Sequence, residues 1–260
     1  MSAETLFKAG KLDEAISALN SQLKDNPSDQ RGRTFLFELL CFAGDFDRAE
    51  KQLNILEQEG NKDSVLATLL YKTALHGERT RLDMFENKSY PKQAINGKTT
   101  LVRGKLNGKE FTTLSDADPR IGPKLELFAA GEYLWISFED IASIHIEPPK
   151  RLRDLFWIPA KVGTGPSFRS RELGEILLPA LSPLSWQHPE DEVRLGRVSE
   201  WCEDEAGEIS PFGQKNLLVD GEEFPLLEVR ELYIYPAPGS APVEDSAEEE
   251  EEEAPESTMQ

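Results

Sequence analysis

The chain has 260 residues, enough for one large domain or two modest ones. Its 29 basic and 48 acidic residues give a formal net charge of −19, which argues against nucleic-acid backbones and anionic membrane surfaces as partners. No stretch approaches the roughly 18 apolar residues of a membrane span, and residues 1–4 do not begin a secretory signal. We therefore expect a cytoplasmic protein that binds neither nucleic acid nor membrane.

An internal repeat opens the chain. Residues 10–15 (GKLDEA) recur as residues 44–49 (GDFDRA), and Leu19 is matched by Leu53, each pair lying 34 positions apart. This spacing is the period of the tetratricopeptide repeat, a helix-turn-helix unit with a small residue at the turn and an alanine where the two helices pack. The sequence therefore predicts an N-terminal helical-repeat module.

Hydrophobic periodicity extends this module to about residue 88. Apolar side chains recur every three or four residues along 12–23 and 46–56, as in amphipathic helices. Residues 31–42 are apolar on more than one side, which predicts the most buried helix of the stack. A fifth helix is expected over residues 63–75, followed by a short one that reaches Phe85.

The pattern changes after a polar stretch at residues 87–100 that is rich in turn formers. Strand-like segments follow, with Asn107-Gly108 predicting a tight hairpin turn and Asp220-Gly221 a last hairpin between residues 215–219 and 226–235. The sequence thus predicts an α+β fold. Its expected parts are a tetratricopeptide-like module at 1–88, a mainly antiparallel β (α+β) domain at 99–236 and a disordered acidic tail at 237–260.

The tail concentrates negative charge. Residues 244–256 carry nine acidic groups and no basic one, so this segment cannot bury enough apolar surface to offset its chain entropy. We interpret it as a solubilising extension, with an electrostatic lure for a basic partner as the alternative.

Reaction machinery is sparse in this sequence. Motifs for phosphate cradles, nucleophile elbows and paired-cysteine metal sites are absent, and the three histidines are not related by any ligand spacing. We therefore expect no cofactor and no metal. The enzymatic alternative is Mg²⁺ held by Asp116 and Asp118 after a strand. The competing interpretation is a capped turn in which Arg120 pairs with these carboxylates.

A second cluster, residues 152–160 (LRDLFWIPA), places a charged pair beside bulky apolar side chains. In the structural interpretation, Arg153 and Asp154 brace a loop while Trp157 fills the core. In the alternative, the three form a patch that faces a partner, because Trp and Arg are frequent at interface hot spots.

Several segments, in order, resemble one known family. Residues 114–126 (LSDADPRIGPKLE) are similar to the "DADxRxGPxLE" signature of the ImpE family, also called SciE-type or TagJ. Residues 33–42 (RTFLFELLCF), 152–160, 199–201 (SEW) and 225–230 (PLLEVR) resemble further family segments. The family usually has extra helical sequence after its third helix pair, and this chain has a reduced polar stretch there.

The resemblance implies a non-enzymatic adaptor of the bacterial type VI secretion system. In that family the adaptor binds the small contractile-sheath subunit (TssB) through that subunit's N-terminal helix and is linked to sheath recycling by the ClpV ATPase. The alternative is a tetratricopeptide-like adaptor that serves another cytoplasmic complex. No family motif marks the contact residues.

The candidate site residues therefore come from physical reasoning. The partner-binding candidates are Phe42, Phe46, Arg153, Asp154 and Trp157, with burial in the core as the alternative, above all for Phe42. The signature residues expected to be structural are Asp116, Asp118, Arg120, Gly122 and Pro123.

Overall fold

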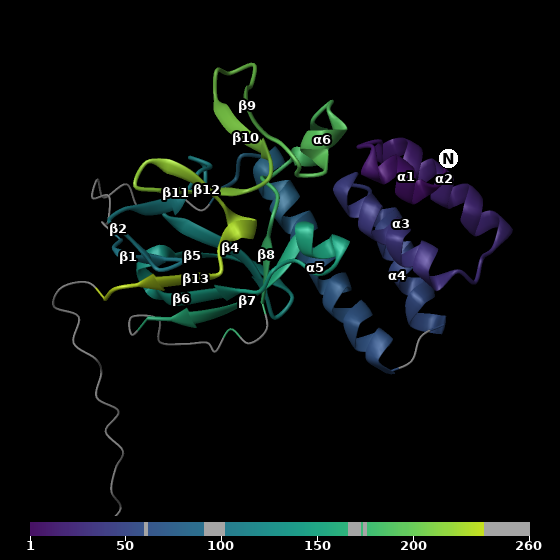
Figure 1. Ribbon diagram of the computed structural model, residues 1–260, viewed down its shortest axis with the longest axis horizontal. Helices are drawn as coiled ribbons and strands as arrows, with labels where there is room; N and C mark the ends of the chain where they lie inside the picture. The colour runs from purple at the N-terminus through teal and green to yellow at the C-terminus, as the bar shows by residue number, and fades with distance from the viewer. Residues whose placement is uncertain (60–61, 91–101, 166–172, 174–175, 237–260) are drawn as a thin grey trace, which may run out of the picture.

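The computed structural model describes residues 1–59, 62–90, 102–165, 173 and 176–236. Helices gather at one side of the molecule and β-sheets at the other, with the long fifth helix running between them (Figure 1). The expected acidic tail lies outside the described residues, as does most of the expected boundary segment.

The N-terminal part is a stack of helices in which each packs on the next. They are α1 (Ala3–Lys8), α2 (Leu12–Asp25), α3 (Gln30–Phe42), α4 (Phe46–Glu59) and α5 (Lys62–Glu86). The repeat-like arrangement predicted from the 34-residue period is confirmed, and α3 is buried along most of its length. In contrast, the two segments predicted over 63–85 form one continuous helix, α5. No helix in the described part of the chain combines the length and apolar composition that crossing a bilayer demands.

The two repeat turns have the same geometry. Gly10 and Gly44 follow α1 and α3 with φ angles of 74° and 70°, a left-handed conformation that glycine adopts without steric cost. The next residue donates its N–H to a carbonyl five positions earlier in both turns, Lys11 to Leu6 and Asp45 to Leu40, at 3.0 Å each. This hydrogen bond ends a helix in the Schellman motif, so the sequence repeat is a repeated helix stop.

The C-terminal part is mainly antiparallel β-structure. The strands are β1 (Gly104–Leu106), β2 (Lys109–Phe111), β3 (Leu114–Asp116), β4 (Lys124–Ala129), β5 (Glu132–Ser137), β6 (Ile141–Ile146), β7 (Trp157–Thr164), β8 (Ile176–Pro179), β9 (Ser199–Glu203), β10 (Ile209–Gly213), β11 (Asn216–Val219), β12 (Glu222–Pro225) and β13 (Glu231–Ile234). Short helical segments are η1 (Phe138–Asp140), η2 (Leu152–Leu155), η3 (Ser185–Gln187), α6 (Asp191–Arg194) and η4 (Leu226–Glu228).

The main sheet has eight strands in the order β2-β1-β13-β6-β7-β8-β4-β5, and smaller sheets join β12-β11-β3 and β10-β9. The Asn107-Gly108 turn connects β1 to β2 as predicted, with φ angles of 48° and 83°. The last hairpin differs from the prediction. After Asp220-Gly221 the chain returns as β12, and residues 226–228 form η4 before β13 enters the main sheet.

Two apolar clusters hold the fold together. One lies within the β-sheets and contains side chains such as Ile144 and Leu232. The other is continuous from the helices into the sheet part, where Phe128, Phe156 and Trp157 pack against the helical residues. Burial of apolar surface therefore joins the helical stack firmly to the β-structure.

Candidate functional site

The five partner-binding candidates lie together at the junction between the helices and the sheets. Phe42, Phe46 and Trp157 are no more than 5% exposed, and Asp154 is also buried. The Arg153 side chain is 15% exposed. These residues come from α3, α4, η2 and β7, so the structure does bring them together, but inside the molecule.

Aromatic packing forms the centre of this junction. The ring of Phe156 makes edge contacts with Phe42 and Phe46, at centroid distances of 5.3 and 6.4 Å. Trp157 stacks on Tyr71 of α5 at 6.2 Å. Buried aromatic pairs in such arrangements add to the free energy gained from burying their apolar area. The aromatic candidates thus stabilise the contact between the two parts of the chain.

The charged candidates have internal partners as well. Arg153 donates to Glu38 of α3 at 2.9 Å, and its guanidinium lies 4.9 Å from the ring centre of Tyr71. The carboxylate of Asp154 accepts the backbone N–H groups of Lys150 and Arg151 at 2.8 and 2.9 Å. Arg153 therefore links η2 to the helices, and Asp154 holds the loop that carries it.

A partner could reach Phe42, Phe46, Asp154 and Trp157 only if the junction opened, because these four side chains are buried, whereas part of the Arg153 side chain faces solvent. Their role in partner binding remains a prediction. Sequence reasoning did not identify Glu38, which is a charged residue within the otherwise apolar run 35–42 and for that reason could have been noticed. Tyr71 and Phe156 gave no comparable signal.

The signature segment forms a compact turn after β3. Asp116 accepts the N–H of Asp118 at 2.9 Å, and the Arg120 side chain donates to both carboxylate oxygens of Asp118. Gly122 has a φ of 63° and its carbonyl accepts the N–H of Asp116 at 2.7 Å, while the carbonyl of Pro123 accepts the N–H of Phe138 at 3.1 Å. Through these contacts the five residues hold the turn after β3, and their purely structural role stays a prediction.

Asp116 also belongs to a buried ionic cluster that joins three parts of the fold. Lys215 lies 2.6 Å from Asp116 and 2.5 Å from Glu126 of β4. Arg81 of α5 binds the other side of Glu126 at 2.9 Å and also pairs with Glu78. All of these side chains are at most 8% exposed. Removing one of these side chains by mutation would leave a buried charge without its partner, which lowers the stability of the fold.

The two carboxylates that share Lys215 differ in their pKa. Burial raises the pKa of Asp116 to about 7, despite the opposing charge of Lys215. Glu126 is equally buried, but Arg81 and Lys215 together outweigh that burial and lower its pKa to about 2. A second cation therefore keeps Glu126 ionised, and Asp116 is the member of the pair that takes up a proton.

The magnesium alternative is disfavoured by the same contacts. Asp116 is neutralised by Lys215 and Asp118 by Arg120, at 2.6 and 2.7 Å. A divalent cation would have to displace both basic side chains before it could bind the two carboxylates. The arrangement serves the fold and offers no open coordination site.

Another group of potential metal ligands joins His188, Glu200 and Cys202, whose ligand atoms lie within 4.8 Å of one another. Sequence spacing had not connected His188 with β9. The backbone N–H of Glu190 donates to His188 Nδ1 at 3.1 Å, so the neutral ring carries its proton on Nε2, the nitrogen 3.4 Å from Glu200. Because that nitrogen has no free lone pair, the group is better described as a histidine–glutamate contact than as a metal site.

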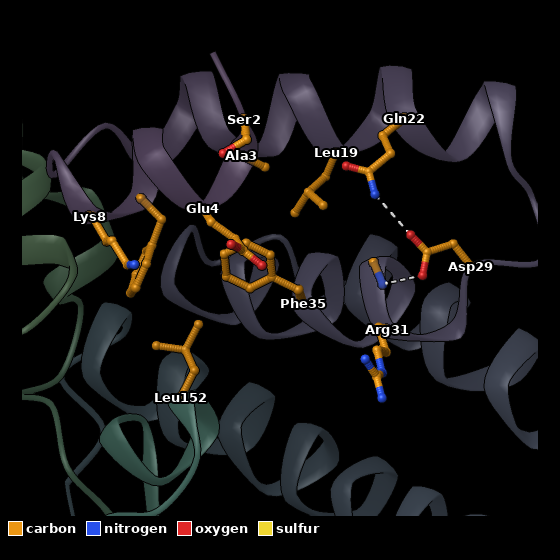
Figure 2. A pocket seen from close by; sticks show the side chains of 12 residues that line it. Ser2, Ala3, Glu4, Lys8, Leu19, Gln22, Asp29, Arg31, Phe35 and Leu152 are labelled. Atoms are coloured by element: carbon orange, nitrogen blue, oxygen red, sulfur yellow. Dashed lines mark hydrogen bonds between the residues drawn. The ribbon is translucent and has the colours of Figure 1, made fainter.

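An open pocket of about 610 Å³ lies at the N-terminal end of the helical stack. Figure 2 shows side chains from α1, α2, α3 and η2 around it, among them Glu4, Leu19, Phe35 and Leu152. Phe7 and Phe35 meet edge to face at a centroid distance of 5.7 Å. The volume of the pocket falls in the range of about 300–1,000 Å³ that is usual for ligand sites.

Two family models match the chain. The model described as "ImpE protein" matches residues 108–233, and a tetratricopeptide repeat model matches residues 6–72. The second match agrees with the repeat found in the helices.

One relative is similar to this chain in sequence along most of its length, and one solved structure is similar to it in fold. The type VI secretion system accessory component TagJ of Pseudomonas aeruginosa is 31% identical over 270 residues, covering 91% of this chain and 92% of TagJ. A crystal structure of protein VPA1032 from Vibrio parahaemolyticus superposes with a TM-score of 0.75 at 20% identity, covering 90% of this chain and 98% of that one. This structural likeness bears on the fold alone.

Proposed function

Because the chain belongs to the ImpE family, of which TagJ is a type VI secretion accessory component, we propose that it is a non-enzymatic adaptor. It binds the small contractile-sheath subunit through that subunit's N-terminal helix and connects the sheath to the ClpV ATPase that recycles it. The observation that carries this proposal is the 31% identity to TagJ across 91% of the chain.

The architecture is suited to binding a helix without any chemical reaction. A stack of helices offers a preformed surface on which an amphipathic helix can place apolar anchors three and four residues apart. The open pocket beside α1 and α3 is one such surface, with the aromatic ring of Phe35 in its wall. The buried aromatic junction behind the helices packs this surface against the sheets, and a preformed surface loses less entropy on binding.

Affinity purification of the tagged full chain from its source organism, with mass spectrometry of co-eluting proteins, tests the proposal. We expect the small sheath subunit to be enriched together with ClpV. A matched purification from cells whose sheath subunit lacks its N-terminal helix should lose the sheath subunit. Recovery of a different complex with neither protein would contradict the proposal and favour an adaptor for that complex.

A further inference from the structure

The open pocket at the N-terminal end of the helical stack lies next to a part of the stack that is covered by η2, a segment of the same chain. Leu152 of η2 lines this pocket, while its neighbour Arg153 lines a smaller pocket of about 190 Å³ between α3, α4 and α5. The segment η2 therefore lies against α3 between the two pockets, on one face of the helical stack. It occupies the middle of this face, and the larger pocket, at the N-terminal end, has the room for an external segment.

We infer that this N-terminal pocket is the docking site for one turn of an amphipathic partner helix that carries a large apolar side chain and, close to it, an arginine or lysine. The inference rests on the proposed function, since it assigns the adaptor's helix-binding site to particular residues of α1, α3 and η2.

The chain's own segment indicates the chemistry that suits this face. The short helical turn η2 presents Leu152 and Arg153, and the arginine pairs with Glu38 of α3 at 2.9 Å. The apolar side chain next to it packs on the helical cluster. A helical segment that combines an apolar anchor with a basic group is thus already bound by the same face of the stack.

The open end repeats these features on α1. Glu4 lines the pocket with an exposed carboxylate and forms no ion pair with another described residue, whereas the Glu38 carboxylate that pairs with Arg153 is buried. Phe7, Phe35 and Leu152 supply the apolar surface, and Glu4 and Phe35 both line the same pocket (Figure 2). A basic group on the partner would therefore meet Glu4 while its apolar anchor meets Phe35.

The overall charge of the chain favours the same partner. A formal net charge of −19 attracts basic segments over several ångströms and accelerates their encounter. Specific binding still needs a local contact, because the diffuse field acts on any cation. The carboxylate of Glu4 beside an apolar wall supplies that contact.

The test measures binding of the full-length chain to a synthetic peptide of the small sheath subunit's first helix, by isothermal titration calorimetry at physiological salt. Glu4→Arg reverses the charge at the pocket and should weaken binding about tenfold or more. Asp25→Arg makes the same change on an exposed residue outside the pocket and should leave binding within about twofold. Phe35→Ala removes the apolar contact and should also weaken binding at least about tenfold.

Circular dichroism and thermal unfolding of each variant establish that it is folded, and Glu4→Arg gives an independent reading because Glu4 is exposed. If the wild type binds the peptide and both pocket variants bind equally well, the pocket assignment is wrong while the proposed function stands. If neither the peptide nor the intact sheath subunit binds the wild type, the proposed function fails and the pocket assignment fails with it.

Discussion

Asp191 caps a helix that begins 179 positions earlier in the chain. Its Oδ2 accepts the backbone N–H of Leu12, the first residue of α2, at 2.8 Å. In the second repeat, the residue directly before α4 is Asp45, and it caps α4 itself by accepting the N–H of Arg48 at 3.3 Å. Lys11 stands at that position in the first repeat and makes no such contact. The sheet part of the chain thus completes a helix of the repeat module.

This relationship predicts that Asp191→Ala lowers stability through α2. The loss of a capping acceptor should reduce the free energy of unfolding by about 1 kcal/mol, and hydrogen exchange at the start of α2 should accelerate. Asp191→Asn retains a side-chain oxygen and should lose less. Equal exchange in wild type and the alanine variant at Leu12 and the following amides would show that the contact carries no stability.

Alanine substitutions at two glycines with positive φ, Gly44 and Gly108, allow the cost of backbone strain to be compared with the cost of a packing clash. Gly44 and Gly108 have φ angles of 70° and 83°, yet their surroundings differ: a Cβ on Gly44 would lie 2.5 Å from the Trp186 ring, and one on Gly108 would touch nothing within 4 Å. Both alanine variants should lose about 1–2 kcal/mol to the left-handed backbone. Gly44→Ala should lose more because Trp186 must move.

Urea unfolding of the two variants measures this difference. A similar loss at both positions would mean that the contact between the second repeat turn and Trp186 is loose enough to absorb a methyl group.

Two lysines that each contact two carboxylates offer a second matched pair. Lys215 lies 2.6 Å from Asp116 and 2.5 Å from Glu126 in the buried cluster. Lys88 makes contacts of 2.8 and 2.7 Å with Asp204 and Glu208, but half of its side chain is exposed. Lys215→Met should lower the free energy of unfolding by about 3–5 kcal/mol, because it leaves two carboxylates buried beside an apolar group.

Lys88→Met should leave the midpoint of thermal unfolding nearly unchanged, since water and salt already screen the exposed contacts. Calorimetry measures both unfolding midpoints. If Lys215→Met and Lys88→Met lowered the midpoint by similar amounts, burial would not be what makes the Lys215 contacts stabilising.

The raised pKa of Asp116 predicts a pH dependence near neutrality. The folded state holds the proton up to about pH 7, whereas the unfolded carboxyl releases it near its ordinary value of 3.8. The group's contribution to stability is therefore fully present below 3.8 and is lost as pH rises through about 7. Glu126 has the opposite effect, because its pKa is lowered to about 2 in the folded state. Its contribution to stability is present above its ordinary pKa of 4.5 and is lost as pH falls from 4.5 towards 2.

Asp116→Asn should remove the decline between about pH 4 and pH 7 while leaving the loss at acidic pH that Glu126 causes. The measurement is the free energy of unfolding in urea at several pH values for both proteins. The prediction fails if the wild type and the variant have the same slope across neutral pH.

Local patterns in the sequence were sufficient for the repeat and for the Asn107-Gly108 turn. A helix stop or a tight turn depends on residues a few positions apart, so glycine at residues 10 and 44 and an Asn-Gly pair predict their conformations directly. The continuity of α5 was missed because its charged residues interrupt the apolar pattern, and their partners lie elsewhere in the fold. Arg81, for example, is satisfied by Glu126 of β4.

The candidate site was less accessible to sequence reasoning. The cluster 152–157 correctly indicated a bulky apolar group beside a charged pair, but a partner surface and an internal junction require the same residue types. Only packing distinguishes them: Trp157 stacks on Tyr71 and Arg153 reaches Glu38, 115 positions away. The open pocket beside Glu4 and Phe35 gave no sequence signal, because α1, α2, α3 and η2 form it jointly.

By itself, the sequence determined the helical repeat, the order of helices before strands and the family resemblance, since periodicity, turn chemistry and motifs are written in neighbouring residues. Tertiary structure alone decided which charges are buried together, which aromatic residues are hidden and where a surface stays open. The physical reason is that burial and pairing depend on segments far apart in the chain, as when Asp191 reaches Leu12 to complete α2.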